Sequence, residues 1–197
     1  DYWTRLNFVA HQNGTKVKTV SQTKDDNGFG EVAMSLTPGS YQILVLAHSS
    51  KSNPSLSDPE KIQFTNADGF TDTFYYYGDV TVTSEAQQHN ISLKRATAML
   101  RFTIDDNMPS TVSTIRFYYT GGSGALNAKT GRGCVASQQS VFFDVDPSVG
   151  KPYTFEVYTM PREQTGKLNL TVTTFTSNEN IVKAREFKDV PVECNKI

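Results

Sequence analysis

The chain has 197 residues, enough for one large domain or for two of about 100 residues, and either size can bury a substantial core. Its 19 basic and 20 acidic residues nearly balance and form no long run of one sign, which argues against a nucleic-acid-binding surface or a polybasic membrane patch. Phe, Tyr, Thr and Val are abundant, which favours β-structure, and no apolar run approaches the roughly 18 residues that a transmembrane helix needs.

The chain opens with a predicted β-hairpin. Apolar and polar residues alternate over residues 4–11, and Asn13-Gly14 is a strong signal for a two-residue turn before a return strand over residues 17–23. A polar turn at residues 25–28 and a connection over residues 29–36 follow.

The segment Leu36–Ala47 is predicted to contain the central strand of this half. Pro38 and Gly39 favour a sharp turn, because Pro presets φ at the first corner and Gly accepts positive φ at the second. Apolar side chains then occupy both faces of an extended strand, Tyr41, Ile43, Val45 and Ala47 on one and Leu44 and Leu46 on the other. A strand that is apolar on both faces is expected inside a sheet.

The rest of the first half reads as a surface loop followed by short strands. The loop, residues 49–60, is rich in Ser, Asn and Pro. The predicted strands cover residues 70–77, 80–83 and 91–93, and Gly78-Asp79 is interpreted as the turn between the first two.

A second set of strands begins at residue 98. Two strands with one apolar face each are predicted over residues 98–104 and 114–119, and the glycine-rich segment 121–133 is interpreted as a flexible hairpin loop. Four further strands are predicted over residues 141–145, 153–158, 168–175 and 181–187. Ten to fifteen short strands are too many for one ordinary sandwich, so we predict an all-β protein of two sandwiches, residues 1–94 and 95–197.

The junction between these predicted domains resembles a known family. The run Ile91–Ile104, followed by Met108-Pro109, Val112 and Ile115-Arg116-Phe117, is similar to the domain junction of the fimbrillin-like fimbrial subunits of Bacteroidales. The turn at Pro38-Gly39 before Tyr41 and the closing segment Phe187–Asn195 resemble the same family, most closely its anchor and minor-subunit branch.

The resemblance implies two tandem Greek-key, transthyretin-like β-sandwich domains and a non-enzymatic cell-surface role without a cofactor. It also implies assembly with other fimbrial subunits by strand exchange, in support of adhesion. It further implies an exported outer-membrane lipoprotein, whose only membrane attachment is a lipid on a cysteine that would precede Asp1. Family members usually continue beyond the equivalent of Ile197 into another strand. We therefore expect a bare strand edge, with Val190 and Val192 as the candidate strand-exchange positions.

No catalytic or metal-binding set emerges from the sequence. Gly121–Ala125 lacks the second glycine of a nucleophile elbow, and Lys129-Thr130 lacks the glycine and the strand-helix context of a phosphate-binding loop. Two acidic turns, residues 25–28 and 105–107, lack the later acidic residue of an EF-hand and are interpreted as turns. Three histidines stand alone and are interpreted as surface or strand-edge residues: His11, His48 and His89.

Consecutive aromatic residues give a rival hypothesis. Four rings in a row on one strand must turn some faces outward, where they could stack on sugars or anchor a partner, although burial between the two domains explains them equally well. Together with Trp3, they motivate a glycan-binding outer-membrane surface lipoprotein as the alternative function; the four are Phe74, Tyr75, Tyr76 and Tyr77. The sequence is compatible with either one disulfide between Cys134 and Cys194 or two buried thiols.

Overall fold

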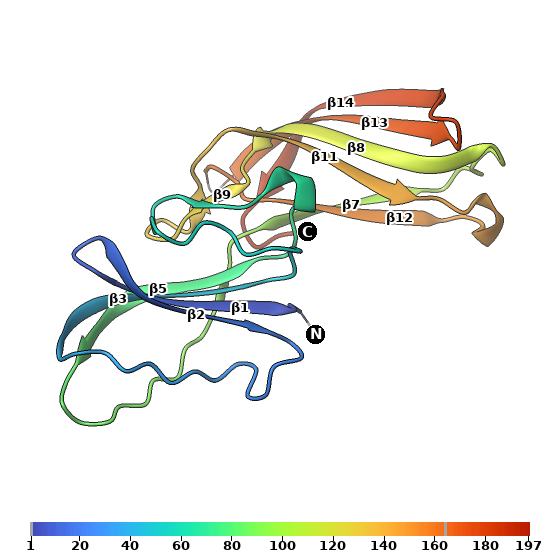
Figure 1. The fold of residues 1–197 in the computed structure, drawn as a ribbon. Helices are drawn as coiled ribbons and strands as arrows, with labels where there is room; N and C mark the ends of the chain where they lie inside the picture. Colours follow the sequence, from blue (N-terminus) through green and yellow to red (C-terminus); the bar gives the residue numbers. More distant parts are fainter. Residues whose placement is uncertain (1, 164) are drawn as a thin grey trace.

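The computed structural model describes residues 2–163 and 165–197, and its regular structure is almost entirely β-strand, which confirms the all-β prediction (Figure 1). The first half carries a 3₁₀ helix, Asn66–Asp68, and the strands β1 (Arg5–Gln12), β2 (Thr15–Thr23), β3 (Gly39–His48), β4 (Ile62–Gln63), β5 (Phe74–Val82) and β6 (Lys94–Arg95). The second half carries a 3₁₀ helix, Pro147–Val149, and the strands β7 (Ala98–Ile104), β8 (Val112–Gly122), β9 (Ala125–Asn127), β10 (Arg132–Gly133), β11 (Ser137–Asp144), β12 (Tyr153–Thr159), β13 (Thr165–Thr176) and β14 (Ile181–Glu193).

The first half is organised around β3, as predicted. Its five-stranded antiparallel sheet has the order β2-β1-β3-β5-β6, so β3 lies at the centre. The β1–β2 hairpin turns at Asn13 and Gly14, whose φ angles of 51° and 77° are the positive values that a tight two-residue hairpin turn requires.

Two strand predictions in this half are wrong. Strand β5 runs without interruption through Gly78 and Asp79, so there is no turn between residues 70–77 and 80–83. A Cβ at Gly78 would collide with the phenol of Tyr76, so this glycine makes room for a ring within a strand. Residues 91–93 form no strand, and the short strand β6 begins at Lys94 instead.

One face of the five-stranded sheet is covered by the chain's own connections. Leu6, Phe8, Val45 and Ala47 point to this face and are buried. The covering side chains include Trp3 and the residues Phe29, Val32 and Met34 of the β2–β3 connection.

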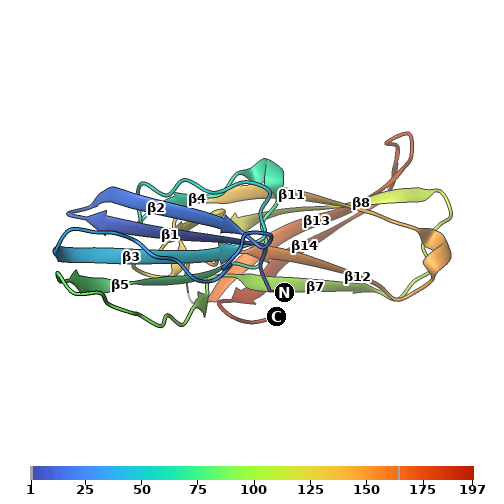
Figure 2. The same cartoon turned by 60° about the horizontal axis from the view of Figure 1, so that its bottom comes forward.

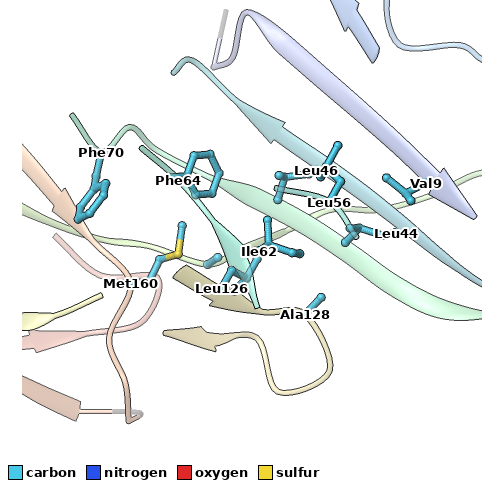
Figure 3. Close-up of a cluster of buried hydrophobic side chains, with 11 residues drawn as sticks. Val9, Leu44, Leu46, Leu56, Ile62, Phe64, Phe70, Leu126, Ala128 and Met160 are labelled. Atoms are coloured by element: carbon cyan, nitrogen blue, oxygen red, sulfur yellow. The ribbon is translucent and has the colours of Figure 1, made fainter. Parts of the chain in front are cut away.

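The opposite face is covered partly by the second half of the chain. Val9, Leu44 and Leu46 of the sheet pack against Ile62 and Phe64 and also against Leu126, Ala128 and Met160. Figure 3 shows Leu126 and Met160 among side chains of the first half. We call this cluster the shared core.

The interpretation of residues 121–133 as a flexible hairpin loop is therefore wrong. The segment contains β9 and β10, which join β4 in a three-stranded sheet of order β10-β9-β4. Leu126 is fully buried, and a Cβ at Gly124 would collide with the ring of Phe70. Small residues here allow close packing onto the first half. The division into domains 1–94 and 95–197 stays a prediction.

The second half is built from two facing sheets. A four-stranded sheet of order β11-β8-β13-β14 lies over a sheet that contains only β12 and β7 (Figures 1 and 2). Phe117 of β8 is at the centre of the core between them, and its ring centroid lies 5.1 Å from that of Phe102 and 5.5 Å from that of Phe155. In both views the C-terminus lies between the two halves.

Candidate functional site

The two-stranded sheet is too narrow to cover the four-stranded sheet that faces it. Neighbouring strands lie about 4.8 Å apart, so two strands leave part of a four-stranded face without an opposing strand. Phe155 of β12 contacts Phe143 of β11, and Phe102 of β7 contacts Phe187 of β14, with ring centroids 5.4 Å and 5.5 Å apart. The free side of β7 is therefore the side next to β14.

Beyond Met99, the backbone of β7 has no partner along this free side in the described structure. The N–H of Met99 donates to the carbonyl oxygen of Lys196 at 3.0 Å, so Met99 turns its backbone groups away from β12. Backbone groups alternate in direction along an antiparallel strand, so Arg101 and Thr103 also turn their N–H and C=O groups away from β12. Within residues 2–163 and 165–197 these groups have no backbone partner.

The side chains of β7 alternate between an apolar face and a polar face. Leu100, Phe102 and Ile104 face the core of the second half and are partly buried. Arg101 points outward and pairs with Glu156 of β12 at 2.8 Å. Both members of this ion pair are well exposed, so it contributes little to stability.

Strand β14 is uncovered opposite this edge. Phe187 is 36% exposed although its ring contacts Phe102. Arg185 is paired with Val172, which faces the core, so Arg185 lies on the inner face of the sheet and is nevertheless exposed. A strand added beside β7 would lie opposite β14 and cover Phe187. We call Arg101, Phe102, Thr103 and Phe187 the β7 edge site.

The candidate strand-exchange residues lie nearby on β14. Val190 pairs with Leu168 and Val192 with Gly166 of β13, the neighbouring strand. Val190 is partly buried, whereas Val192 is only 6% exposed and belongs to the core of the second half. Their role in strand exchange stays a prediction, and a charge at Val192 would disturb the core as well as the edge.

The four consecutive aromatic residues alternate between the two faces of β5. Tyr75 and Tyr77 pack against the shared core, and Phe74 and Tyr76 pack against the core on the opposite face. All four are partly buried. Their part in binding a glycan or a partner stays a prediction.

Two histidines are in the interior, so their interpretation as surface or strand-edge residues is wrong. His48 is fully buried, its Nε2 lies 3.0 Å from Asn7 Oδ1, and its ring stands edge-on to Phe64. Burial, helped by the cationic Arg5, lowers the pKa of His48 to about 4. His11 Nε2 lies 3.2 Å from the Leu56 carbonyl oxygen, and burial lowers the pKa of His11 too. Both histidines lie on strands rich in apolar residues, and this sequence pattern could have predicted their burial.

The remaining candidates form no chemical centre. In the described part of the chain, no three His, Cys, Asp or Glu residues gather closely enough to hold a metal ion. Cys134 and Cys194 are free thiols, and burial raises the pKa of each. In the acidic turn at residues 25–28, Asp26 Oδ2 accepts a bond from the N–H of Thr23 at 2.6 Å, so this carboxylate closes a turn. No described helix is long and apolar enough to cross a membrane.

Comparison with known proteins assigns the chain to a family. The model of the fimbrillin-A associated anchor proteins Mfa1 and Mfa2 matches residues 4–190. A comparison with curated protein sequences found no match.

Two solved structures from Bacteroides species share the fold. An adhesin candidate from Bacteroides ovatus ATCC 8483 has a TM-score of 0.65 at 14% identity, over 95% of this chain and 77% of its own. A candidate polysaccharide-binding protein from Bacteroides thetaiotaomicron has a TM-score of 0.57 at 16% identity, over 92% and 72%. The fimbrial anchor protein Mfa2 from Porphyromonas gingivalis has a TM-score of 0.47 at 14% identity, over 93% and 74%. The first two likenesses establish a common fold and carry nothing finer.

Proposed function

Because the chain belongs to the family of fimbrillin-A associated anchor proteins, we propose that it is a fimbrium-associated surface protein that accepts a β-strand from another fimbrial subunit. The acceptor is the β7 edge site. The observation that carries the proposal is the unpaired backbone of Arg101 and Thr103 beside the exposed ring of Phe187.

A strand added at this edge would form backbone hydrogen bonds and bury apolar side chains at the same time. The incoming strand bonds to the N–H and C=O groups of Arg101 and Thr103, each bond contributing about 1 kcal/mol net. Its alternate side chains face the core and cover Phe187, which adds about 25 cal/mol for each Å² of apolar surface buried. Backbone bonds supply affinity for any strand, and the fit against Phe187 supplies selection among strands.

The rest of the proposal concerns location and role. We place the protein on the outer membrane, held there by a lipid on a preceding cysteine, as an anchor or minor component of a fimbrium that supports adhesion. We assign it no catalytic activity. The family membership supports a surface role, and the proposed strand acceptor supports a role in assembly.

A proline substitution tests the acceptor edge. Thr103→Pro removes an N–H that has no backbone partner in the described structure, so folding should survive while strand addition fails. Thr154→Pro is the matched control, because Thr154 pairs with Thr103 and turns its backbone to the opposite, β12 edge of the same sheet.

The readout is an SDS gel of surface extracts, probed for this protein with and without boiling. The wild type and Thr154→Pro should give a ladder that survives cold detergent and collapses on heating, and Thr103→Pro should give the monomer. An unchanged ladder in Thr103→Pro, or its loss in both variants, would overturn the assignment of the β7 edge as acceptor.

A further inference from the structure

A second surface lies at the junction of the two halves. A groove of about 750 Å³ opens between the start of β5, β6, β10 and the C-terminal segment 193–196. We propose that this junction groove binds an acidic polysaccharide, through cationic side chains on its walls and aromatic rings at its side. The proposal is independent of strand exchange.

The charge of the groove is opposite in sign to that of the whole chain. The chain carries a net charge of −1, yet one carboxylate, Glu193, stands in the groove among four cationic side chains: Lys94, Arg95, Arg132 and Lys196. Clefts lined by one sign of charge concentrate the field and attract ligands of the opposite sign.

Three of these cations are available to a ligand. Arg95 is held by Asp72 at 3.1 Å. No ion pair in the described part of the chain involves Lys94, Arg132 or Lys196. Lys94 and Lys196 are exposed, and Arg132 is half-buried. Arg132 presents a planar fork of donors that suits a carboxylate or sulfate group, and the two lysines add mobile point charges.

Aromatic rings continue from the groove onto the neighbouring surface. Phe74 lines the groove, and its ring centroid lies 5.3 Å from that of Trp3 and 6.4 Å from that of Tyr2. Tyr2 is 75% exposed. The Arg95 guanidinium lies 4.9 Å from the Phe74 ring centroid, so the cations and the rings form one continuous surface.

Gly131 makes room for a further aromatic ring in the groove, that of Tyr75. A Cβ at this position would collide with the hydroxyl of Tyr75, so the absence of a side chain lets the phenol of Tyr75 lie directly against the turn before β10. Tyr75 and Gly131 both line the groove.

These features together favour an acidic sugar polymer over an acidic peptide. Sugar rings have apolar C–H faces that stack on exposed aromatic rings, and their carboxylate or sulfate groups pair with Arg and Lys. A peptide of acidic residues alone, such as poly-glutamate, has charges for the cations but no ring to stack on the aromatic side chains. The test is therefore to separate the contribution of charge from that of the rings.

The experiment compares three probes with the purified chain at low salt: polygalacturonate, neutral dextran and poly-glutamate. Polygalacturonate should bind most tightly, and dextran should not bind. Lys94→Gln/Lys196→Gln should weaken polygalacturonate binding about tenfold, because two screened ion pairs are lost. The matched control Lys183→Gln/Lys188→Gln, on exposed positions of β14, should bind like the wild type.

The Tyr2→Ala variant separates the contribution of the aromatic rings to binding from that of the cationic side chains. It should weaken polygalacturonate binding about threefold, as expected for the loss of one stacking contact, and leave poly-glutamate binding unchanged. Thr103→Pro should bind polygalacturonate normally, which keeps this test separate from strand exchange. Poly-glutamate binding as tight as polygalacturonate binding, no effect of the Lys94/Lys196 double variant, or no polygalacturonate binding would overturn the proposal.

Discussion

The two halves of the molecule close their β-sheets in different ways. In the first half, both faces of one five-stranded sheet are covered, one by the β2–β3 connection and the other partly by Leu126 and Met160 from the second half. In the second half, two sheets cover each other, but one has only two strands in the described structure, so one edge of β7 has no neighbouring strand.

This difference suggests different roles for the two halves: only the second half has a free strand edge at which we propose assembly. The first half has its faces closed and depends on the second half for part of its core. The second half has a complete core around Phe117, and its two-stranded sheet ends at the free edge of β7. The strand addition that we propose would therefore require no unfolding, because one edge of β7 has no neighbouring strand among the described residues.

The largest expected effect concerns Val192, where the edge strand meets the core. Val192→Asp places a charge at a position only 6% exposed, and we expect it to lower the free energy of unfolding by about 4 kcal/mol. Val182→Asp, on an exposed position of the same strand, should cost less than about 1 kcal/mol. Urea unfolding of both variants measures the difference. Equal losses would mean that the end of β14 is a free edge and not part of the core.

A somewhat smaller effect tests the dependence of the first half on the second. Leu126→Ala empties part of the shared core and should lower the free energy of unfolding by about 3 kcal/mol. Trp3, the single tryptophan, packs with the first half and reports its unfolding by fluorescence. Lys129→Ala, exposed in the same segment, is the control. An unshifted Trp3 transition in Leu126→Ala would show that the first half is independent.

The smallest effect is a pH dependence confined to the first half. The pKa of His48 is lowered to about 4 in the folded protein, so protonation favours the unfolded chain, where the pKa is about 6.5. This contribution to stability is fully present above pH 6.5 and falls as the pH drops toward 4. Between pH 7 and pH 5 the loss should reach about 2 kcal/mol.

Unfolding followed at Trp3 over this pH range measures the loss. His48→Gln should flatten most of the slope, whereas His89→Gln, at an exposed position, should leave it unchanged. A slope that persists in His48→Gln would assign the pH dependence to other groups, with His11 the first to examine because burial lowers its pKa as well.

The sequence predicted the parts of the fold that depend on local signals. Asn13-Gly14 marked the β1–β2 hairpin, and the apolar faces of residues 41–47 marked the central strand. Gly78 and the glycines of residues 121–133 were misread as turn and loop signals. Gly78 instead makes room for the ring of Tyr76 two residues away. Gly124 and Gly131 make room for the rings of Phe70 and Tyr75, and these two contacts join residues that are distant in the sequence.

The candidate site was predictable only in part. Family resemblance pointed to a bare edge near the C-terminus, and β14 is an edge strand. That β7 has one strand neighbour, and that Arg101 and Thr103 are its unpaired residues, depends on how the strands divide between two sheets. Alternating apolar residues at 98–104 predict a strand with one buried face, but they carry no information about which strands lie beside it.

The most direct measurement is amide hydrogen exchange along β7 and β12, before and after assembly with the partner subunit. In the free protein, the N–H groups of Arg101, Thr103 and Thr154 should exchange rapidly, and those of Leu100 and Phe102 should be protected. On assembly, Arg101 and Thr103 should become protected while Thr154 stays rapid. Continued rapid exchange at Arg101 and Thr103 in the assembled state would contradict strand addition at this edge.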